Sequence, residues 1–95
     1  MSFELLLPMP LGEVTATPAA LDALNRAKAS PLALIARHRA GDWGDVCDQD
    51  SRANDDALRH GGRIVSAYAV SLGVRVWVIT ESDREATTIL LPAEY

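Results

Sequence analysis

The side chains of this 95-residue chain that are best suited to chemistry lie at the end of a predicted helix and in a later turn. His60 and Arg63 frame the sequence "HGGR", and Glu81 and Arg84 belong to the turn "ESDR". An imidazole and a carboxylate can move protons while guanidinium groups hold a phosphate, so these residues could act together on a phosphodiester. The alternative, which we favour, is a capped turn in which Arg84 pairs with Asp83 or Glu81. The same region holds further polar residues, namely Tyr68, Thr80, Thr87 and Thr88.

Metal binding and thiol chemistry find little support in the spacing of the candidate ligands. His38, Cys47 and His60 lie nine and thirteen residues apart, which matches no zinc motif. An acidic run starts at Asp48, but Arg59 stands where a calcium loop of this register requires glutamate. Cys47 needs a base to act as a nucleophile, and a buried, inert cysteine is the expected alternative. The sequence also lacks the usual nucleotide-binding loops, so we expect neither a metal nor a cofactor.

The sequence "GDWGDVCDQD" (41–50) places Trp43 between two Gly-Asp pairs, directly after the basic "RHR". We expect the Trp43 ring to pack between two helices and the sheet. In the alternative, the ring is exposed and stacks on a single-stranded nucleic acid, with Arg37 and Arg39 on the phosphates. The candidate binding residues are His38, Asp42, Trp43, Asp45 and Tyr68.

Composition and charge restrict the classes of protein to consider. The chain has 48% hydrophobic and 23% charged residues, as in folded globular proteins, and its length suffices for one domain. The formal net charge of -4 gives no general attraction for nucleic acid. One cysteine, no secretory signal and no apolar run of about 20 residues predict a cytoplasmic protein without a membrane span.

Three helices are predicted within residues 17–60. Thr17 and Ser30 each precede a proline, which is typical of an N-cap followed by the first helical residue. The basic residues 37–39 fall in the last turn of the second helix, where positive charge complements the helix dipole. Its predicted buried face consists of Leu32, Ile35 and Ala36. The third helix begins with Asp48 or Asp50 as its N-cap and ends before Gly61.

The apolar period changes to two after the third helix, in the runs 63–70, 74–80 and 87–91. The short connections between these runs predict an antiparallel meander, with Trp77 covering the core. Residues 1–16 contribute an arm or edge strand at Phe3 to Leu7. We therefore predict a single α+β domain over residues 1–95, with helices in 17–60 packed on a three- to four-stranded antiparallel sheet in 63–92.

Residues 38–95 resemble a group of small uncharacterised bacterial proteins called plasmid-related proteins. The motifs that carry the resemblance are "H-x-x-GDWG", "N-x-x-AL", "GGRIVSAY", "VWVITESDR", "TTILLP" and a terminal "EY". Members are carried on plasmids and integrative elements, so the resemblance implies a mobile-element setting. The name of type I restriction enzyme modification subunit, which some members bear, does not fit, because a methyltransferase requires a doubly wound parallel sheet and a glycine-rich loop.

A weaker similarity links "RIVSAY", "VWVIT" and "ESDREATT" to the last strands of barnase-type ribonucleases. Arg63 falls where that family keeps a phosphate-binding arginine. Arg84, however, stands where the family keeps its catalytic histidine, and the predicted strands before Arg63 supply no glutamate base.

These observations leave three functional hypotheses open. The first is an accessory protein of a mobile genetic element that acts by protein-protein contact, with a possible homodimer through the Phe3 to Leu7 arm or the sheet edge. The second is a small barnase-like ribonuclease or toxin that uses Arg63 and Arg84, with His60 and Glu81 as further candidates. The third is a single-stranded nucleic-acid binding module. We favour a non-enzymatic role because the sequence shows no complete catalytic set.

Overall fold

The structure of the protein, a computed structural model, describes residues 6–95. The predicted α+β class is confirmed: a helical region is followed by the strands that form most of one sheet. The predicted strand at Phe3 to Leu7 falls largely on residues 1–5, outside the described part of the chain. The elements are β1 (Glu13–Ala16), α1 (Pro18–Ala27), α2 (Pro31–Arg39), α3 (Asp48–His60), β2 (Ile64–Ser71), β3 (Val74–Thr80), β4 (Ala86–Leu90) and the 3-10 helix η2 (Pro92–Glu94).

The sheet has the strand order β1-β4-β3-β2 and is mixed. β2, β3 and β4 form the predicted antiparallel meander, whereas β1 pairs parallel to β4. The expectation of a purely antiparallel sheet is therefore wrong for β1, which is connected to β4 only through the helices and two strands, the long type of connection that parallel pairing requires. Gly12 permits this pairing, because a Cβ there would lie 2.2 Å from the carbonyl carbon of Glu85.

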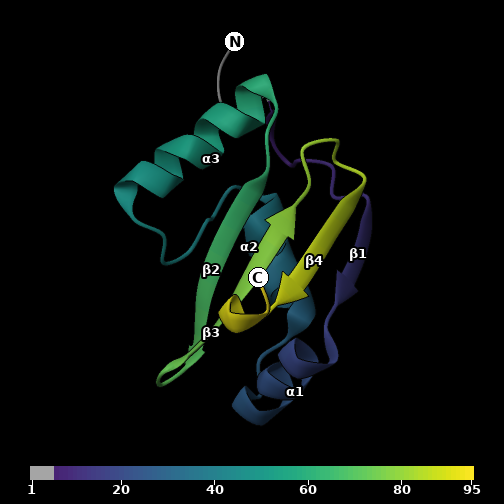
Figure 1. The fold of residues 1–95 in the computed structure, drawn as a ribbon, viewed down its shortest axis with the longest axis vertical. Coiled ribbons are helices and arrows are strands. Elements are labelled where there is room, and N and C mark those ends of the chain that lie inside the picture. The colour runs from purple at the N-terminus through teal and green to yellow at the C-terminus, as the bar shows by residue number, and fades with distance from the viewer. Residues whose placement is uncertain (1–5) are drawn as a thin grey trace.

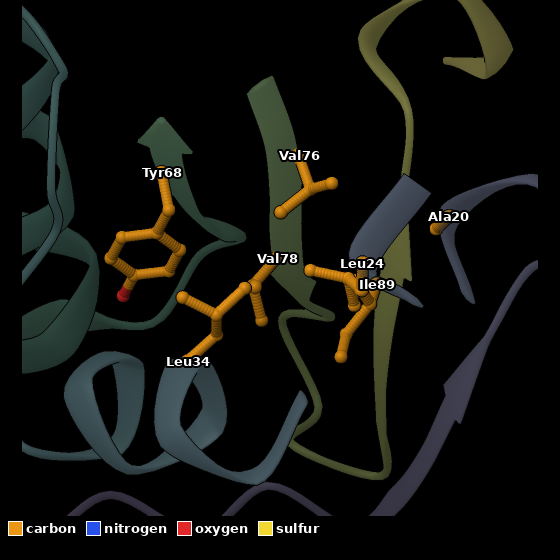
Figure 2. Packing of buried hydrophobic residues seen from close by; sticks show 7 residues of the cluster. All are labelled: Ala20, Leu24, Leu34, Tyr68, Val76, Val78 and Ile89. Carbon is orange, nitrogen blue, oxygen red and sulfur yellow. The ribbon is translucent and has the colours of Figure 1, made fainter. Parts of the chain in front are cut away.

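Helices α1 and α2 cover one face of the sheet, while α3 lies beside β2 (Figure 1). The side chains between α1, α2 and the sheet form the main hydrophobic core (Figure 2). We call the opposite side of the sheet the open face. The residues of the core cluster are Ala20, Leu24, Leu34, Tyr68, Val76, Val78 and Ile89.

The helix starts follow the sequence prediction at α1 and α2 but not at α3. The side chains of Thr17 and Ser30 accept hydrogen bonds from backbone amides of the first turn, as predicted. The N-cap of α3 is Cys47, whose Sγ lies 3.5 Å from the amide nitrogen of Asp50. Asp48 and Asp50 instead occupy the first turn, where their carboxylates face the positive end of the helix dipole.

The buried face of α2 also differs from the prediction. Leu34 and His38 are its buried residues, and Leu32 is 79% exposed. Ile35 of the predicted face still packs against the core, but the burial of Leu34 and His38 shifts the inward face by about a third of a turn. His38 therefore belongs to the interior of the protein.

The β2 edge of the sheet is covered by residues 43–45 and by Asn54 of α3. The amide of Ala67 donates to the carbonyl of Trp43 at 3.0 Å, and the amide of Asp45 donates to the carbonyl of Ala67 at 2.7 Å. The Asn54 side chain exchanges two hydrogen bonds with the backbone of Val65. The loop that contains Trp43 thus acts as a short additional strand. No helix within residues 6–95 has the length and apolar character needed to cross a membrane.

Candidate functional site

A chain of buried polar side chains runs from α2 into the sheet, and we call it the buried relay (His38, Ser66, Thr80 and Thr87). His38 Nδ1 lies 2.5 Å from Ser66 Oγ, and His38 Nε2 lies 2.8 Å from Thr80 Oγ1. Thr80 Oγ1 in turn lies 2.7 Å from Thr87 Oγ1, which donates to the carbonyl of Leu11. All four side chains are buried.

The donor direction in the buried relay follows from its last hydrogen bond. The hydroxyl proton of Thr87 is used on a carbonyl, so Thr80 must donate to Thr87 and accept from His38. His38 Nε2 therefore carries the proton, and Nδ1 accepts from Ser66. Every ring nitrogen of a neutral His38 is thus satisfied inside the protein.

The neutral charge and the burial of His38 exclude two roles that the sequence suggested, a positive charge at the end of α2 and contact with a ligand. Burial lowers the pKa of His38 from 6.5 to about 4, and the positive charge of Arg84 acts in the same direction. A neutral ring adds no charge to the last turn of α2, so the dipole argument holds for Arg37 and Arg39 only. The ring is also fully buried, which removes it from any contact with a ligand.

Trp43 packs inward, as we expected, and offers no stacking platform. It is 5% exposed and shares a hydrophobic cluster with Met9, Ala57 and Ile64. Its Nε1 donates to Asp55 at 3.0 Å. The ring also meets His38 edge-on, with centroids 5.9 Å apart. The Trp43 platform for nucleic acid is therefore not accessible.

Asp42 and Tyr68 are held in the same region by local bonds. Arg37 forms an ion pair with Asp42 at 2.6 Å, and its guanidinium lies 4.5 Å from the centre of the Tyr68 ring. Bonding to Arg37 holds the pKa of Asp42 below its ordinary value. The Tyr68 hydroxyl donates to the carbonyl of Asp42 at 2.6 Å, and burial raises the pKa of Tyr68 to about 12. Of the candidate binding residues, three are therefore buried, Asp42 is exposed in an ion pair with Arg37, and Asp45 faces a hollow.

Of the four residues proposed for phosphodiester chemistry, Arg63, Glu81 and Arg84 lie at the same end of the sheet, but their side chains are bonded within the protein. Arg84 donates to the backbone carbonyls of Ala57 at 2.9 Å, Gly62 at 2.6 Å and Glu81 at 3.0 Å, so it joins the end of α3 to the β3–β4 turn. The predicted salt bridge between Arg84 and Glu81 is wrong, because the Glu81 carboxylate pairs with Arg63 at 3.2 Å. His60 is exposed at the end of α3.

The polar residues of this region lie on both faces of the sheet. Thr80 and Thr87 form a buried cross-strand pair in the relay, below the helices. Arg63 and Glu81 lie at the surface, where Arg63 also contacts the Tyr95 hydroxyl. Strand alternation explains the split, because neighbouring residues of a strand point to opposite faces.

The open face contains a hollow of about 440 Å³, which we call the tryptophan hollow. Trp77 lines it and meets Tyr95 edge-on, with ring centroids 5.5 Å apart. The prediction that Trp77 covers the core is wrong: Val76 and Val78 point to the core, so Trp77 points to the open face and is only partly buried. Val65 and Ala67 of β2 also line the hollow. Its charged lining residues are Asp45, Asp50, Arg63 and Arg75.

A second depression of about 800 Å³, the hairpin hollow, adjoins the β2–β3 turn. Leu91 and Pro92 line it together with residues of the turn. Leu72 at the tip of this turn is fully exposed, at 102%. Arg75 lines both hollows, so they adjoin one another along the open face.

Cys47 is exposed on the wall of the tryptophan hollow, so the expectation of a buried cysteine is wrong. Its possible base, His60, lies at the opposite end of α3, roughly 20 Å away at 1.5 Å per helical residue. The two residues therefore do not form a nucleophile-base pair. Within residues 6–95, no three histidine, cysteine or acidic side chains gather closely enough to hold a metal ion.

Comparison with known proteins adds no family assignment. No family model, curated protein or solved structure matches this chain. The site is therefore defined by its geometry alone. Sequence reasoning overlooked Arg75 and Tyr95 and placed Trp77 on the wrong face. The signal for Arg75 and Trp77 was the alternation "VRVWV", in which three valines share one face of β3 and both larger residues share the other.

Proposed function

We propose that the chain is a protein-binding module that acts through the open face of its sheet. The observation that carries this proposal is the grouping of Trp77, Tyr95 and Arg75 beside two adjoining hollows. Tryptophan, tyrosine and arginine are the residue types most enriched at the energetically important centres of protein interfaces. Tyr95 is 61% exposed, so a large aromatic surface is available for contact.

The alternative of a ribonuclease is less well supported by the geometry. A catalytic set requires an accessible base beside a group that stabilises charge. His38 is buried and Arg84 is bonded to backbone carbonyls, which leaves Arg63 with its partner Glu81 accessible at the surface. Single-strand binding is disfavoured because Trp43, the proposed stacking platform, is only 5% exposed.

The resemblance to plasmid-related proteins supports a mobile-element setting for this binding role. In that setting, we propose an accessory protein whose action depends on its partner. The absence of an assembled catalytic set among the described residues fits such a role, because a binding surface needs no reactive group.

A retention experiment tests the proposed function. Tagged wild-type chain, Trp77→Ala and Arg26→Glu are incubated with a lysate of the organism from which the sequence comes, and retained proteins are identified by mass spectrometry. Trp77→Ala removes the aromatic anchor of the open face, whereas Arg26→Glu changes an exposed residue of α1. We expect the wild type and Arg26→Glu to retain the same protein and Trp77→Ala to lose it. The retained protein can be an untagged copy of the chain itself.

Two results would contradict the proposal. One is the absence of any protein retained by the wild type but not by Trp77→Ala. The other is degradation of total RNA by the purified chain that Arg63→Ala abolishes, since that result would establish the ribonuclease alternative. Circular dichroism of each variant confirms that it is folded before either assay is read.

A further inference from the structure

Three charged side chains of the tryptophan hollow are available for pairing with another molecule. In the described part of the chain, the side chains of Arg75, Asp45 and Asp50 form no hydrogen bond or ion pair, although the charge of Asp45 acts on Arg37 from a distance. Arg63, by contrast, is paired with Glu81. Unpaired charges of opposite sign therefore line one hollow without meeting each other.

The opposite charges lie on different sides of β2. Asp45 and Asp50 come from the segment that leads into α3 and from its first turn. Arg75 belongs to β3, on the other side of β2. The floor between them is apolar and is formed by Val65 and Ala67 of β2. The hollow thus has an acidic wall, a basic wall and an apolar floor.

We propose that the occupant of the open face is a second copy of the chain, bound face to face about a two-fold axis that runs along β2. This inference rests on the proposed function and names the partner. A half-turn about such an axis sets the acidic wall of each copy against the basic wall of the other. The contact between Arg75 and the pair Asp45 and Asp50 then occurs twice, which is the self-complementarity that an isologous interface requires.

The apolar parts of the open face fit the same arrangement. Leu72 lines the hairpin hollow and follows the last residue of β2, so it lies near the proposed axis, where a second copy bound face to face covers it. Burial of this fully exposed leucine together with Trp77 and Tyr95 supplies the hydrophobic contribution that homodimer interfaces show at their centre.

The overall dimensions of the protein are compatible with a dimer interface of ordinary size. The protein measures 41 × 27 × 21 Å, and Figure 1 looks along the shortest dimension onto the open face. A specific interface buries about 800 Å² on each partner. The two longer dimensions of the whole protein can accommodate an interface of that size.

A charge-exchange experiment tests the dimer, with molar mass measured by sedimentation equilibrium over a range of protein concentrations. Arg75→Glu sets an acid against Asp45 and Asp50 of the other copy, and the double variant Asp45→Arg with Asp50→Arg sets arginines against Arg75. We expect the dimer of each variant alone to have a dissociation constant about tenfold or more above that of the wild type. An equimolar mixture of the two is expected to recover the dimer, because both contacts then pair opposite charges. Arg26→Glu is the matched control, with the same change in net charge on α1.

The outcomes separate this inference from the proposed function. A wild-type chain that stays monomeric, or a dimer that Arg75→Glu leaves intact, overturns the second copy as occupant. Failure of the mixture to recover the dimer, with both variants folded by circular dichroism, overturns the two-fold arrangement. If the wild type is monomeric yet retains another protein through Trp77, the proposed function stands and only this inference fails.

Discussion

The two faces of the sheet use their polar side chains in opposite ways. On the face below the helices, His38 and its hydroxyl partners are bonded to one another and shielded from water. On the open face, Arg75 and the two acidic residues of the tryptophan hollow line a common space without pairing among the described residues. A buried polar group needs a hydrogen-bond partner inside the protein, whereas an exposed one is hydrated and remains free to bind another molecule.

This difference shows where to look for function in the fold. The residues whose types suggest acid-base chemistry, above all His38, are the ones that the structure uses to hold itself together. The residues that remain available are an arginine and two aromatic rings whose types suggest recognition. Accessible and unpaired groups are therefore a better guide to the site than the chemistry of the side chain alone.

The two tryptophans give the largest expected contrast between the interior and the open face. Trp43→Ala empties a nearly buried site in contact with Met9, Ala57 and Ile64 and removes the bond to Asp55. We expect it to lower the free energy of unfolding by about 4 kcal/mol. Trp77 lies on the open face, where its ring is partly hydrated. We therefore expect Trp77→Ala to lower the free energy of unfolding by only about 1 kcal/mol. Urea denaturation measures both, and equal losses would contradict the contrast.

The buried relay predicts a pH dependence that the open face does not share. His38 binds a proton at its ordinary pKa of 6.5 in the unfolded chain, but only at about 4 in the folded protein. Because the unfolded chain binds the proton more readily, the stability that the neutral ring provides is complete above pH 6.5 and is lost as the pH falls toward 4. We expect the free energy of unfolding to fall by about 2 kcal/mol between pH 7 and 5.

His38→Gln is the control for this pH dependence, because an amide can bond to the hydroxyls but does not titrate. Its unfolding free energy should be nearly constant over the same interval. The pKa values of Asp42 and Glu94 are held below their ordinary values by hydrogen bonds, so these carboxylates contribute at lower pH. Parallel pH profiles for the wild type and His38→Gln would show that His38 is not the cause.

Much of the fold follows from local rules in the sequence. The Thr17-Pro18 and Ser30-Pro31 signals give the helix starts, and the period of two after Gly62 gives the β2–β4 meander. The parallel pairing of β1 is not local, because it depends on where the helices return the chain. A four-residue strand carries too little pattern to show its partner.

The candidate site was harder to predict because it depends on which face of each element is covered. The apolar pattern gave Leu32 as a buried residue of α2 and left out His38, whose hydroxyl partners on β2 and β3 make it suitable for the core. Cys47 was expected inside because free cysteines usually are, but it lies at a helix start beside the hollow. Such facts arise from tertiary packing, which no single segment encodes.

Arg75 in β3 and Arg84 in the β3–β4 turn give the smallest and most local form of the contrast. Arg84 satisfies carbonyls at the end of α3 and in its own turn, so Arg84→Ala should lower the free energy of unfolding by about 2 kcal/mol. Arg75→Ala removes no internal bond and should change it by less than about 0.5 kcal/mol. Because Arg84 has a φ of 62°, Arg84→Gly should recover about 1 kcal/mol of that loss by relieving backbone strain. Urea denaturation of the three variants would contradict this account of Arg84 if Arg75→Ala proved as damaging as Arg84→Ala.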